Sequence, residues 1–407
     1  MSFNLIRELY FERVAGSEQE LKAANIIAKN CKKLGQNVEI EEFFIDNMQN
    51  AQSSLIVDGK EIKSVPVGIT GSTNGQIEKE VVYFSCFDEL ENLKIEDKIC
   101  LNTNKSVGRK IYSELLKRKA AALILCNGSV YDKKTILSPY LLGRVYKLGE
   151  MPTLCIATSD AEKIIRKLPK KAKINIYQEK SSLKSYNVIS EIKGSEKPDE
   201  IICFSAHYDS VAKSKGAYDN ASGCACIMKI MKYFTQNPPA RTLRFIWCGS
   251  EERSMFGSEA YLNMHKEDIS KIKFNINIDM IGVIIGTDMA KVTAHEEWLR
   301  LIKDFANKNK FPLIAQSGLY SSDSNSFAYN GIPAISFFRN SPMNGAQIHS
   351  AKDVISRLSA KNFNKTTNFI IKFSKKLINA KEINLSNEIP QKMKEELDKI
   401  YDMSKEI

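Results

Sequence analysis

The chain has 407 residues, 43% of them hydrophobic, so it can form a large core and is too long for one ordinary domain. Its formal net charge is +11, but the lysines are scattered among acidic residues, and the densest basic run, residues 167–173, contains no aromatic residue. This pattern excludes the usual nucleic-acid-binding modules and predicts a solvated basic surface. The nine cysteines follow no disulfide or metal-site spacing and mostly lie in apolar runs, which predicts buried thiols in a reducing compartment.

The N-terminal ten residues carry charges where a secretory signal peptide needs an unbroken apolar stretch. No window of the chain is apolar and long enough to span a bilayer. We therefore expect a cytoplasmic protein that does not associate with membranes.

The first half of the chain contains two regions with different sequence patterns. Apolar residues at helical spacing predict a helix over residues 1–35, ended by Gly35, and a short strand follows over residues 38–44. Residues 50–183 then contain short apolar runs typical of strands at 81–84, 98–101, 121–125 and 152–157, with a helical segment at 108–119. This stretch has no catalytic constellation, and we interpret it as a small α/β module inserted into a loop.

The second half alternates strands with helices, which predicts an α/β layer with a largely parallel sheet flanked by helices. The predicted strands are residues 187–192, 201–206, 243–248, 274–278 and 334–338, and the clearest helix is 223–234. We predict one discontinuous domain from residues 1–49 and 184–380, an insert over 50–183, and a helical C-terminal tail over 381–407.

Polar residues follow the predicted strands at the points where the strands end. They are His207 and Asp209 after residues 201–206, Glu251 and Glu252 after 243–248, Asp279 after 274–278, and Asp219 just before the helix at 223–234. Because the carboxyl ends of parallel strands meet at one edge of a sheet, we expect these side chains to converge. Imidazole and carboxylate are the usual ligands of catalytic zinc, and Asp219 could bridge two ions.

The histidines show why convergence matters more than any single residue. Taken alone, His207 could be an ordinary core histidine, and His349 could be a surface histidine in a loop. The pairing of His207 with Asp209, two residues on, favours a metal ligand oriented by a second carboxylate. His265 and His295 lie in lysine- and glutamate-rich contexts and are assigned no role.

Five ordered blocks of the second half resemble the co-catalytic zinc aminopeptidases, a family that also includes glutamate carboxypeptidases. The blocks are SAHYDSV (205–211), GAYDNASG (216–223), SEERSMFGS (250–258), NIDMIG (277–282) and IHSAKD (348–353). Their order and spacing make the resemblance specific, whereas one short motif would not.

The resemblance implies a site for two zinc ions. His207 and Asp279 would bind one zinc, Glu252 and His349 would bind the other, and Asp219 would bridge them.

The resemblance also implies the supporting roles. Glu251 would be the general base and Asp209 would support His207, and the peptide bond between Asp219 and Asn220 would be cis. Residues 322–327 resemble a family segment beside the site, except that Ser324 stands where the family usually has an aromatic residue or a histidine.

Residues 50–183 resemble, more loosely, the protease-associated insert of some family members. The similarity depends on residues 94–101 and 152–156. Inserts of this kind shape access to the substrate site rather than react.

The resemblance implies a zinc-dependent aminopeptidase that hydrolyses the N-terminal bond of peptide substrates through a metal-bridging water and a glutamate base. Two alternatives use the same fold. The first is a carboxypeptidase, dipeptidase or amidohydrolase with the same two-zinc site, and the second is a non-catalytic binding homologue. The matching blocks do not indicate which N-terminal residue the enzyme prefers or which oligomeric state it adopts.

Overall fold

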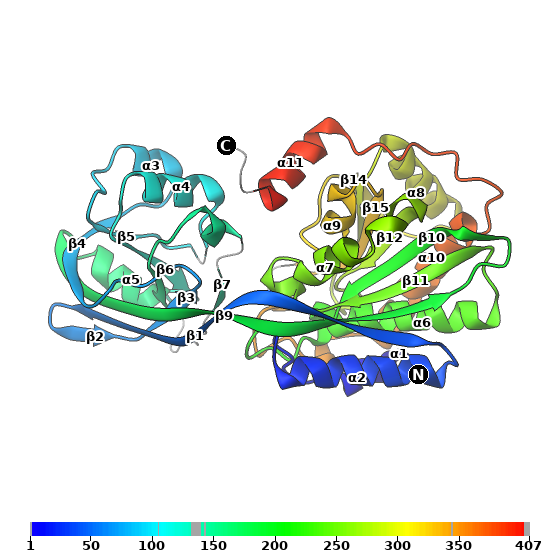
Figure 1. Cartoon of the computed structure of the whole chain (residues 1–407), viewed down its shortest axis with the longest axis horizontal. Helices are drawn as coiled ribbons and strands as arrows, with labels where there is room; N and C mark the ends of the chain where they lie inside the picture. The colour runs from blue at the N-terminus through cyan, green and yellow to red at the C-terminus, as the bar shows by residue number, and fades with distance from the viewer. Residues whose placement is uncertain (1, 105, 132–139, 142–143, 343–344, 403–407) are drawn as a thin grey trace. The chain divides into compact units, whose positions relative to one another are not determined.

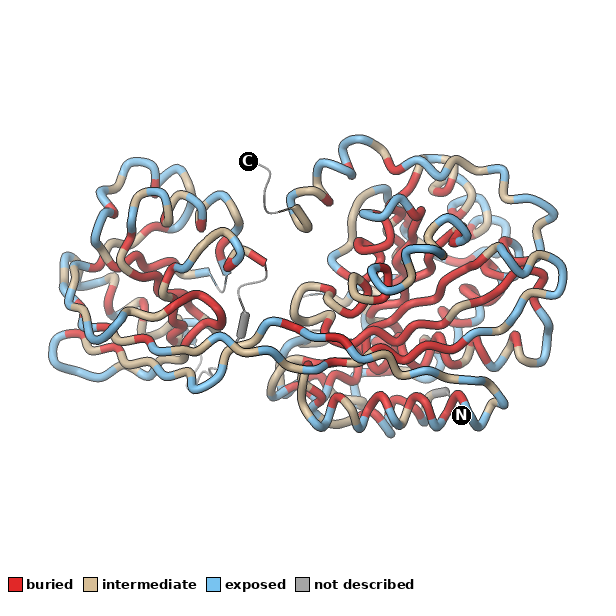
Figure 2. The backbone as a smooth tube through the Cα atoms, viewed as in Figure 1, coloured by how far each residue is buried: buried red, intermediate tan, exposed pale blue. Residues whose placement is uncertain are grey.

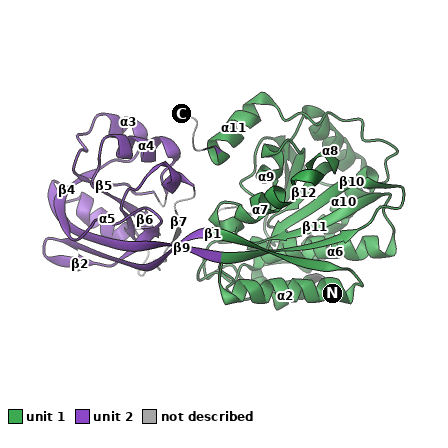
Figure 3. Cartoon of the chain, viewed as in Figure 1, with its two compact units in different colours: residues 1–45, 184–401 green, residues 46–183, 402–407 purple. Residues whose placement is uncertain are grey.

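The computed structural model describes residues 2–104, 106–131, 140–141, 144–342 and 345–402, and the chain forms two compact units (Figure 3). Unit 1 contains Met1–Ile45 and Lys184–Tyr401, and unit 2 contains Asp46–Leu183 and Asp402–Ile407. The chain passes between the units inside two long strands, β1 (Val38–Val57) and β9 (Lys170–Ile192). The sequence predicts only the unit 1 ends of these strands, at 38–44 and 187–192, and a first domain boundary at residue 49, four residues after the boundary in the structure.

Unit 1 is built on a mixed sheet in the order β14-β13-β15-β12-β10-β11-β9, and β1 also pairs with β9 (Figure 1). The further strands are β10 (Lys197–His207), β11 (Arg241–Cys248), β12 (Ile272–Ile278), β13 (Thr287–Thr293), β14 (Ile314–Ser317) and β15 (Ala334–Asn340). The central pairs β11–β10, β10–β12 and β12–β15 are parallel, whereas β9 and β13 run antiparallel to their neighbours β11 and β15. The predicted parallel sheet is confirmed; β13 and β14 were not predicted.

Helices cover both faces of the unit 1 sheet. Alternate residues of β10 face opposite sides: Phe204 lies in the larger core, and Cys203 lies in a smaller one. The larger core receives side chains from α1 (Ser2–Glu8), α2 (Glu18–Lys33), α6 (Ser222–Gln236), α8 (Glu296–Lys308) and α10 (Ala360–Ile378). The smaller core is covered by α7 (Phe256–Met264) and α9 (Ser324–Tyr329). Figure 2 shows the central strands as continuous buried segments, which explains their unbroken apolar sequence.

Two predicted helical regions differ in detail. The helix predicted over residues 1–35 is two helices, α1 and α2, and Ser17 caps the second by accepting a hydrogen bond from the Glu20 amide. Residues 381–401, predicted as part of a separate tail, belong to unit 1. Their helix α11 (Gln391–Tyr401) packs Met393 and Leu397 against Ala328 of α9.

Unit 2 is an α/β module with the strand order β9-β4-β5-β6-β8-β3-β7, and β2 pairs with β1. The strands are β2 (Lys60–Ile62), β3 (Ser64–Gly68), β4 (Ile77–Tyr83), β5 (Ile99–Leu101), β6 (Ala122–Asn127), β7 (Tyr140–Leu141) and β8 (Thr153–Ala157). The helices are α3 (Phe87–Glu91), α4 (Arg109–Lys117) and α5 (Thr158–Ile165). The four predicted strands and the helix predicted at 108–119 are all present. The identification of this unit as a protease-associated insert stays a prediction.

Among the described helices, none combines the length and the apolar character needed to cross a membrane.

Candidate metal centre

The carboxyl ends of β10, β11 and β12 bring the predicted site residues to one edge of the unit 1 sheet. His207 is the last residue of β10, and Asp279 directly follows β12. Glu251 and Glu252 open a short 3-10 helix just after β11. Because β10 lies between β11 and β12 and runs parallel to both, these side chains meet as the sequence predicted.

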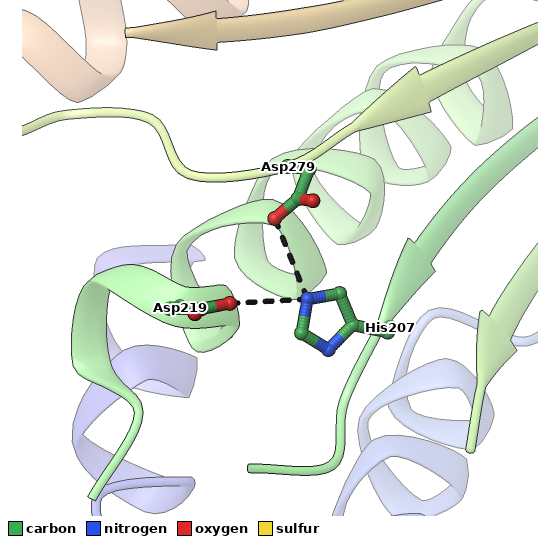
Figure 4. Close-up of side chains that lie close together, drawn as sticks. All are labelled: His207, Asp219 and Asp279. Atoms are coloured by element: carbon green, nitrogen blue, oxygen red, sulfur yellow. Dashed lines mark ion pairs between the residues drawn. The ribbon is translucent and has the colours of Figure 1, made fainter. Parts of the chain in front are cut away.

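His207, Asp219 and Asp279 form a buried triad (Figure 4). The Nε2 atom of His207 lies 3.1 Å from Asp219 Oδ1 and 3.4 Å from Asp279 Oδ1. We call this set the first triad.

Asp219, Glu252 and His349 form a second triad. The Nε2 atom of His349 lies 2.9 Å from Glu252 Oε2 and 3.2 Å from the other oxygen of Asp219, Oδ2. The Asp219 carboxylate therefore belongs to both triads, with one oxygen in each. The His349 side chain is 38% exposed and that of His207 only 1%, so the second triad is the one open to solvent.

The backbone around Asp219 is held by its neighbour. The peptide bond between Asp219 and Asn220 is cis, as the resemblance implied. The Asn220 side chain accepts hydrogen bonds from the Gly223 and Met280 amides at 2.8 and 3.0 Å and donates one to the Ile278 carbonyl at 2.9 Å. These bonds join the start of α6 to the end of β12, which fixes Asp219 beside Asp279.

Asp209 has a second task besides the predicted one. Its Oδ1 lies 3.4 Å from His207 Nδ1, near enough for a carboxylate that orients the imidazole, although the two atoms form no hydrogen bond in this structure. Its two oxygens also accept hydrogen bonds from the backbone amides of Glu251 and Glu252, at 3.1 and 3.2 Å. One buried carboxylate thus lies beside a histidine of the first triad and holds the turn that carries both glutamates, and its orienting role toward His207 stays a prediction.

Five carboxyl groups crowd this edge with two histidines as their bases and no lysine or arginine partner among the described residues: Asp209, Asp219, Glu251, Glu252 and Asp279. In the part of the chain that the structure describes, no lysine or arginine lies within ion-pair distance of any of them. Burial raises the pKa of Glu251 well above its usual range and that of Glu252 to about 7. Burial also disfavours ionised Asp219, but hydrogen bonds with His207 and His349 outweigh it and lower the pKa of Asp219. Two histidines do not balance five carboxyl groups, and divalent cations would supply the further positive charge.

The donor atoms fit a metal ion. Zinc bonds of 2.0 to 2.2 Å to nitrogen and oxygen, arranged as a tetrahedron, would separate neighbouring ligand atoms by about 3.3 Å. The histidine-to-carboxylate distances in the two triads run from 2.9 to 3.4 Å. Asp279 Oδ1 is buried and has no hydrogen-bond partner in the structure. Each triad could therefore hold one metal ion.

Asp353 is a site residue to which the sequence analysis gave no role. Its two carboxylate oxygens accept hydrogen bonds from the Tyr218 and Asp219 amides, at 2.8 and 3.0 Å. Burial raises the pKa of Asp353 to about 6. Its place four residues after His349, inside a recognised block, was the available signal.

Residues 322–327 are buried, and all of them except Phe327 have polar side chains. Asp323 is completely buried, and burial raises its pKa to about 7. Ser324, which departs from the family pattern, is buried with its Oγ 2.7 Å from that of Ser336, so it links α9 to β15.

Comparisons with known proteins agree with this geometry. Residues 187–374 match Peptidase family M28. The chain is 26% identical to mouse carboxypeptidase Q over 320 residues, which are 72% of this chain and 67% of that protein. It is 27% identical to aminopeptidase YwaD of Bacillus subtilis over 278 residues, or 66% of this chain and 58% of that one.

Two solved structures share the fold. An aminopeptidase from Aneurinibacillus sp. strain AM-1 superposes with a TM-score of 0.76 at 21% identity, covering 95% of both chains. The zinc aminopeptidase BSAP of Bacillus subtilis gives the same TM-score and identity, covering 95% of this chain and 96% of that one.

Proposed function

We propose that the chain is a metallo-aminopeptidase that removes N-terminal residues from peptides, and the match of residues 187–374 to peptidase family M28 supports this. The observation that carries the proposal is the shared carboxylate of Asp219, which joins two histidine–carboxylate triads at one sheet edge. An aminopeptidase of Bacillus subtilis at 27% identity and two aminopeptidase structures of the same fold support it.

We assign two zinc ions to the site. The first triad, His207, Asp219 and Asp279, would hold one ion, and Asp219 with Glu252 and His349 would hold the other. Bound zinc would polarise the scissile carbonyl and make a water molecule acidic enough to ionise near neutral pH. Zinc is the metal named for the structurally similar BSAP.

Glu251 is the proposed general base. Its Oε2 lies 3.8 Å from His207 Nε2, and its backbone amide is held by Asp209. A carboxylate there can accept a proton from the attacking water at Oε2 and return it to the leaving amine nitrogen.

The charge of the site favours a free N-terminus over a free C-terminus as the group that substrates present. A free C-terminal carboxylate is usually bound by arginine or lysine, whereas a free N-terminus needs no such cation. No such cation lies within ion-pair distance of the five site carboxylates in the described residues.

The second candidate is carboxypeptidase or dipeptidase activity from the same site. The 26% identity to mouse carboxypeptidase Q supports it. A non-catalytic binding homologue is disfavoured, because every predicted ligand is present and close to its partners. A cytoplasmic location stays a prediction.

Matched substrates separate these functions. We expect the zinc-loaded protein to release 4-nitroaniline from amino-acid 4-nitroanilides with a free amine and to leave their N-acetylated forms intact. Cleavage of N-blocked peptides from the C-terminus, with free-amine substrates untouched, would replace the aminopeptidase proposal with the carboxypeptidase one.

A further inference from the structure

The segment between α1 and α2 carries a completely buried arginine, Arg13. It lies far from the catalytic blocks in sequence and outside the residues that match the peptidase family. Its side chain nevertheless reaches the two segments that deliver His207 and Asp219 to the site.

The Arg13 guanidinium donates to five backbone carbonyls. Its Nη1 and Nη2 bond the carbonyls of Lys215 and Gly216, each at 2.7 Å, and its Nε bonds the Tyr208 carbonyl. Nη1 also bonds the carbonyls of Leu9 and Phe11, at 2.8 and 3.1 Å. Tyr208 lies between the first-triad histidine and the carboxylate that orients it, and Gly216 lies three residues before the shared aspartate.

The backbone of Arg13 is also hydrogen-bonded to the segment that follows β10. Its amide donates to Ser210 Oγ at 3.1 Å, and its carbonyl accepts from the Ser210 amide at 3.2 Å. Arg13 is therefore joined to the segment after β10 from both its backbone and its side chain.

The charge of Arg13 is not matched by a direct partner. Within the described residues, no carboxylate lies at ion-pair distance from it, although Asp209, Asp219 and Asp353 are close enough to act on it electrostatically. Burial lowers the pKa of Arg13. A buried cation without a paired anion is costly, and the nearby carboxylates Asp209, Asp219 and Asp353 offset part of that cost.

Arg241 provides the contrast. It is also completely buried and also donates to backbone carbonyls, those of Leu377, Ile378 and Ala380. It has a direct anionic partner, however, because its Nε lies 2.6 Å from Glu200 Oε2. It opens β11, at the end of that strand opposite to the metal centre.

We propose that Arg13 is a positioning residue of the metal centre. Its guanidinium fixes the strand end that carries His207 relative to the loop that carries Asp219, and its charge offsets part of the repulsion among the site carboxylates. Lysine at this position keeps a charge but cannot reach carbonyls on both sides at once, since the forked guanidinium geometry is lost. The activity part of the proposal rests on the proposed peptidase function; the metal-binding part does not.

The test compares Arg13→Lys with the matched control Arg241→Lys in the full chain. Three quantities are measured: the zinc affinity by competition with a chelator, kcat and KM on a free-amine 4-nitroanilide, and the melting temperature of the zinc-free protein. We expect both variants to melt at lower temperature. Only Arg13→Lys should also weaken zinc binding, by about 10- to 100-fold, and lower kcat more than it raises KM.

Equal zinc affinities and equal kcat values in the two folded variants, within about twofold, would overturn the proposal. Arg13→Gln, assayed at 10 °C, is the second variant in case the lysine variant does not fold. Failure of both Arg13 variants to fold while Arg241→Lys folds would also overturn it, since Arg13 would then serve overall stability. A wild-type protein that binds zinc but cleaves no peptide would reject the proposed function and leave the zinc comparison decisive for Arg13.

Discussion

Among its described residues, unit 1 has two clusters of histidine and carboxylate groups that could hold a metal ion, and they lie at opposite ends of β12. The metal centre lies at its carboxyl end, beside Asp279, whereas His265, Glu267 and Asp268 lie before its amino end. Both clusters have donor atoms close enough to hold a metal ion. Residue type and spacing therefore do not distinguish them.

Charge compensation does distinguish them. Asp268 accepts ion pairs from Arg244 and Lys271, each at 2.8 Å, and His265 Nε2 lies 2.6 Å from Glu41. The five carboxylates of the metal centre pair with histidines alone and have no lysine or arginine partner among the residues that the structure describes. Several buried acids that share two histidines and have no direct lysine or arginine partner indicate a place for metal ions, whereas an acid paired with arginine and lysine, as Asp268 is, indicates a structural role.

The largest expected effect comes from Asp219, the carboxylate that both triads share. Asp219→Ala should reduce bound zinc from two ions per chain to less than one and lower kcat/KM by more than about 10⁴-fold. The matched change at the other cluster, Asp268→Ala, should leave the zinc content unchanged, although it removes two ion pairs and lowers the melting temperature. Elemental analysis of both dialysed variants checks this, and loss of zinc in Asp268→Ala would refute the distinction between the clusters.

Glu251→Gln should separate proton transfer from metal binding. The amide keeps the shape of the side chain but cannot accept the proton, so kcat should fall by about 10²- to 10⁴-fold with two zinc ions still bound. Steady-state kinetics with zinc analysis on the same sample measures both quantities. Turnover close to that of the wild type would remove Glu251 from its proposed role.

Asp353→Ala should have a smaller effect, because Asp353 touches the site only through backbone amides. The Tyr218 and Asp219 amides would lose their acceptor, and we expect zinc affinity to weaken by about 10- to 100-fold. Chelator competition measures this. An unchanged zinc affinity would show that the cis turn holds Asp219 without Asp353.

The smallest expected effect is a pH dependence of the stability that His265 contributes in the cluster of His265, Glu267 and Asp268. The hydrogen bond to Glu41 raises the pKa of His265, so the pair stabilises the fold fully below the unfolded pKa near 6.5. This stabilisation is lost as the pH rises through the raised folded value. His265→Gln should therefore destabilise the zinc-free protein by about 1 kcal/mol at pH 5.5 and by less at high pH, as thermal melts would show. A destabilisation that grows with pH would contradict this sign.

The convergence of the site could be predicted because it depends on short-range patterns. Apolar runs at 201–206, 243–248 and 274–278 identified buried parallel strands, and such strands end at a common edge. The shared role of Asp219 needed the family resemblance, since nothing in the local sequence says that its two oxygens face different histidines.

Two kinds of feature could not be predicted: contacts between residues far apart in the sequence, and strands whose residues are partly exposed to solvent. The Asp353 contact with the Asp219 amide spans 134 residues, and the Arg13 contact with Tyr208 spans 195. The long strands β1 and β9 include many half-exposed residues, so their sequences lack a continuous apolar run. The break between α1 and α2 did have a local signal, the pair Ser17 and Glu20 at capping-box spacing, which the helical periodicity obscured.

The most direct measurement is the number of zinc ions per folded chain after equilibrium dialysis, in the wild-type protein and in His349→Ala. The variant removes the exposed histidine of the second triad and leaves the first triad complete. Two ions in the wild type and one in the variant is the predicted result. One ion or none in the wild type, or equal zinc in both proteins, would contradict a two-ion site bridged by Asp219.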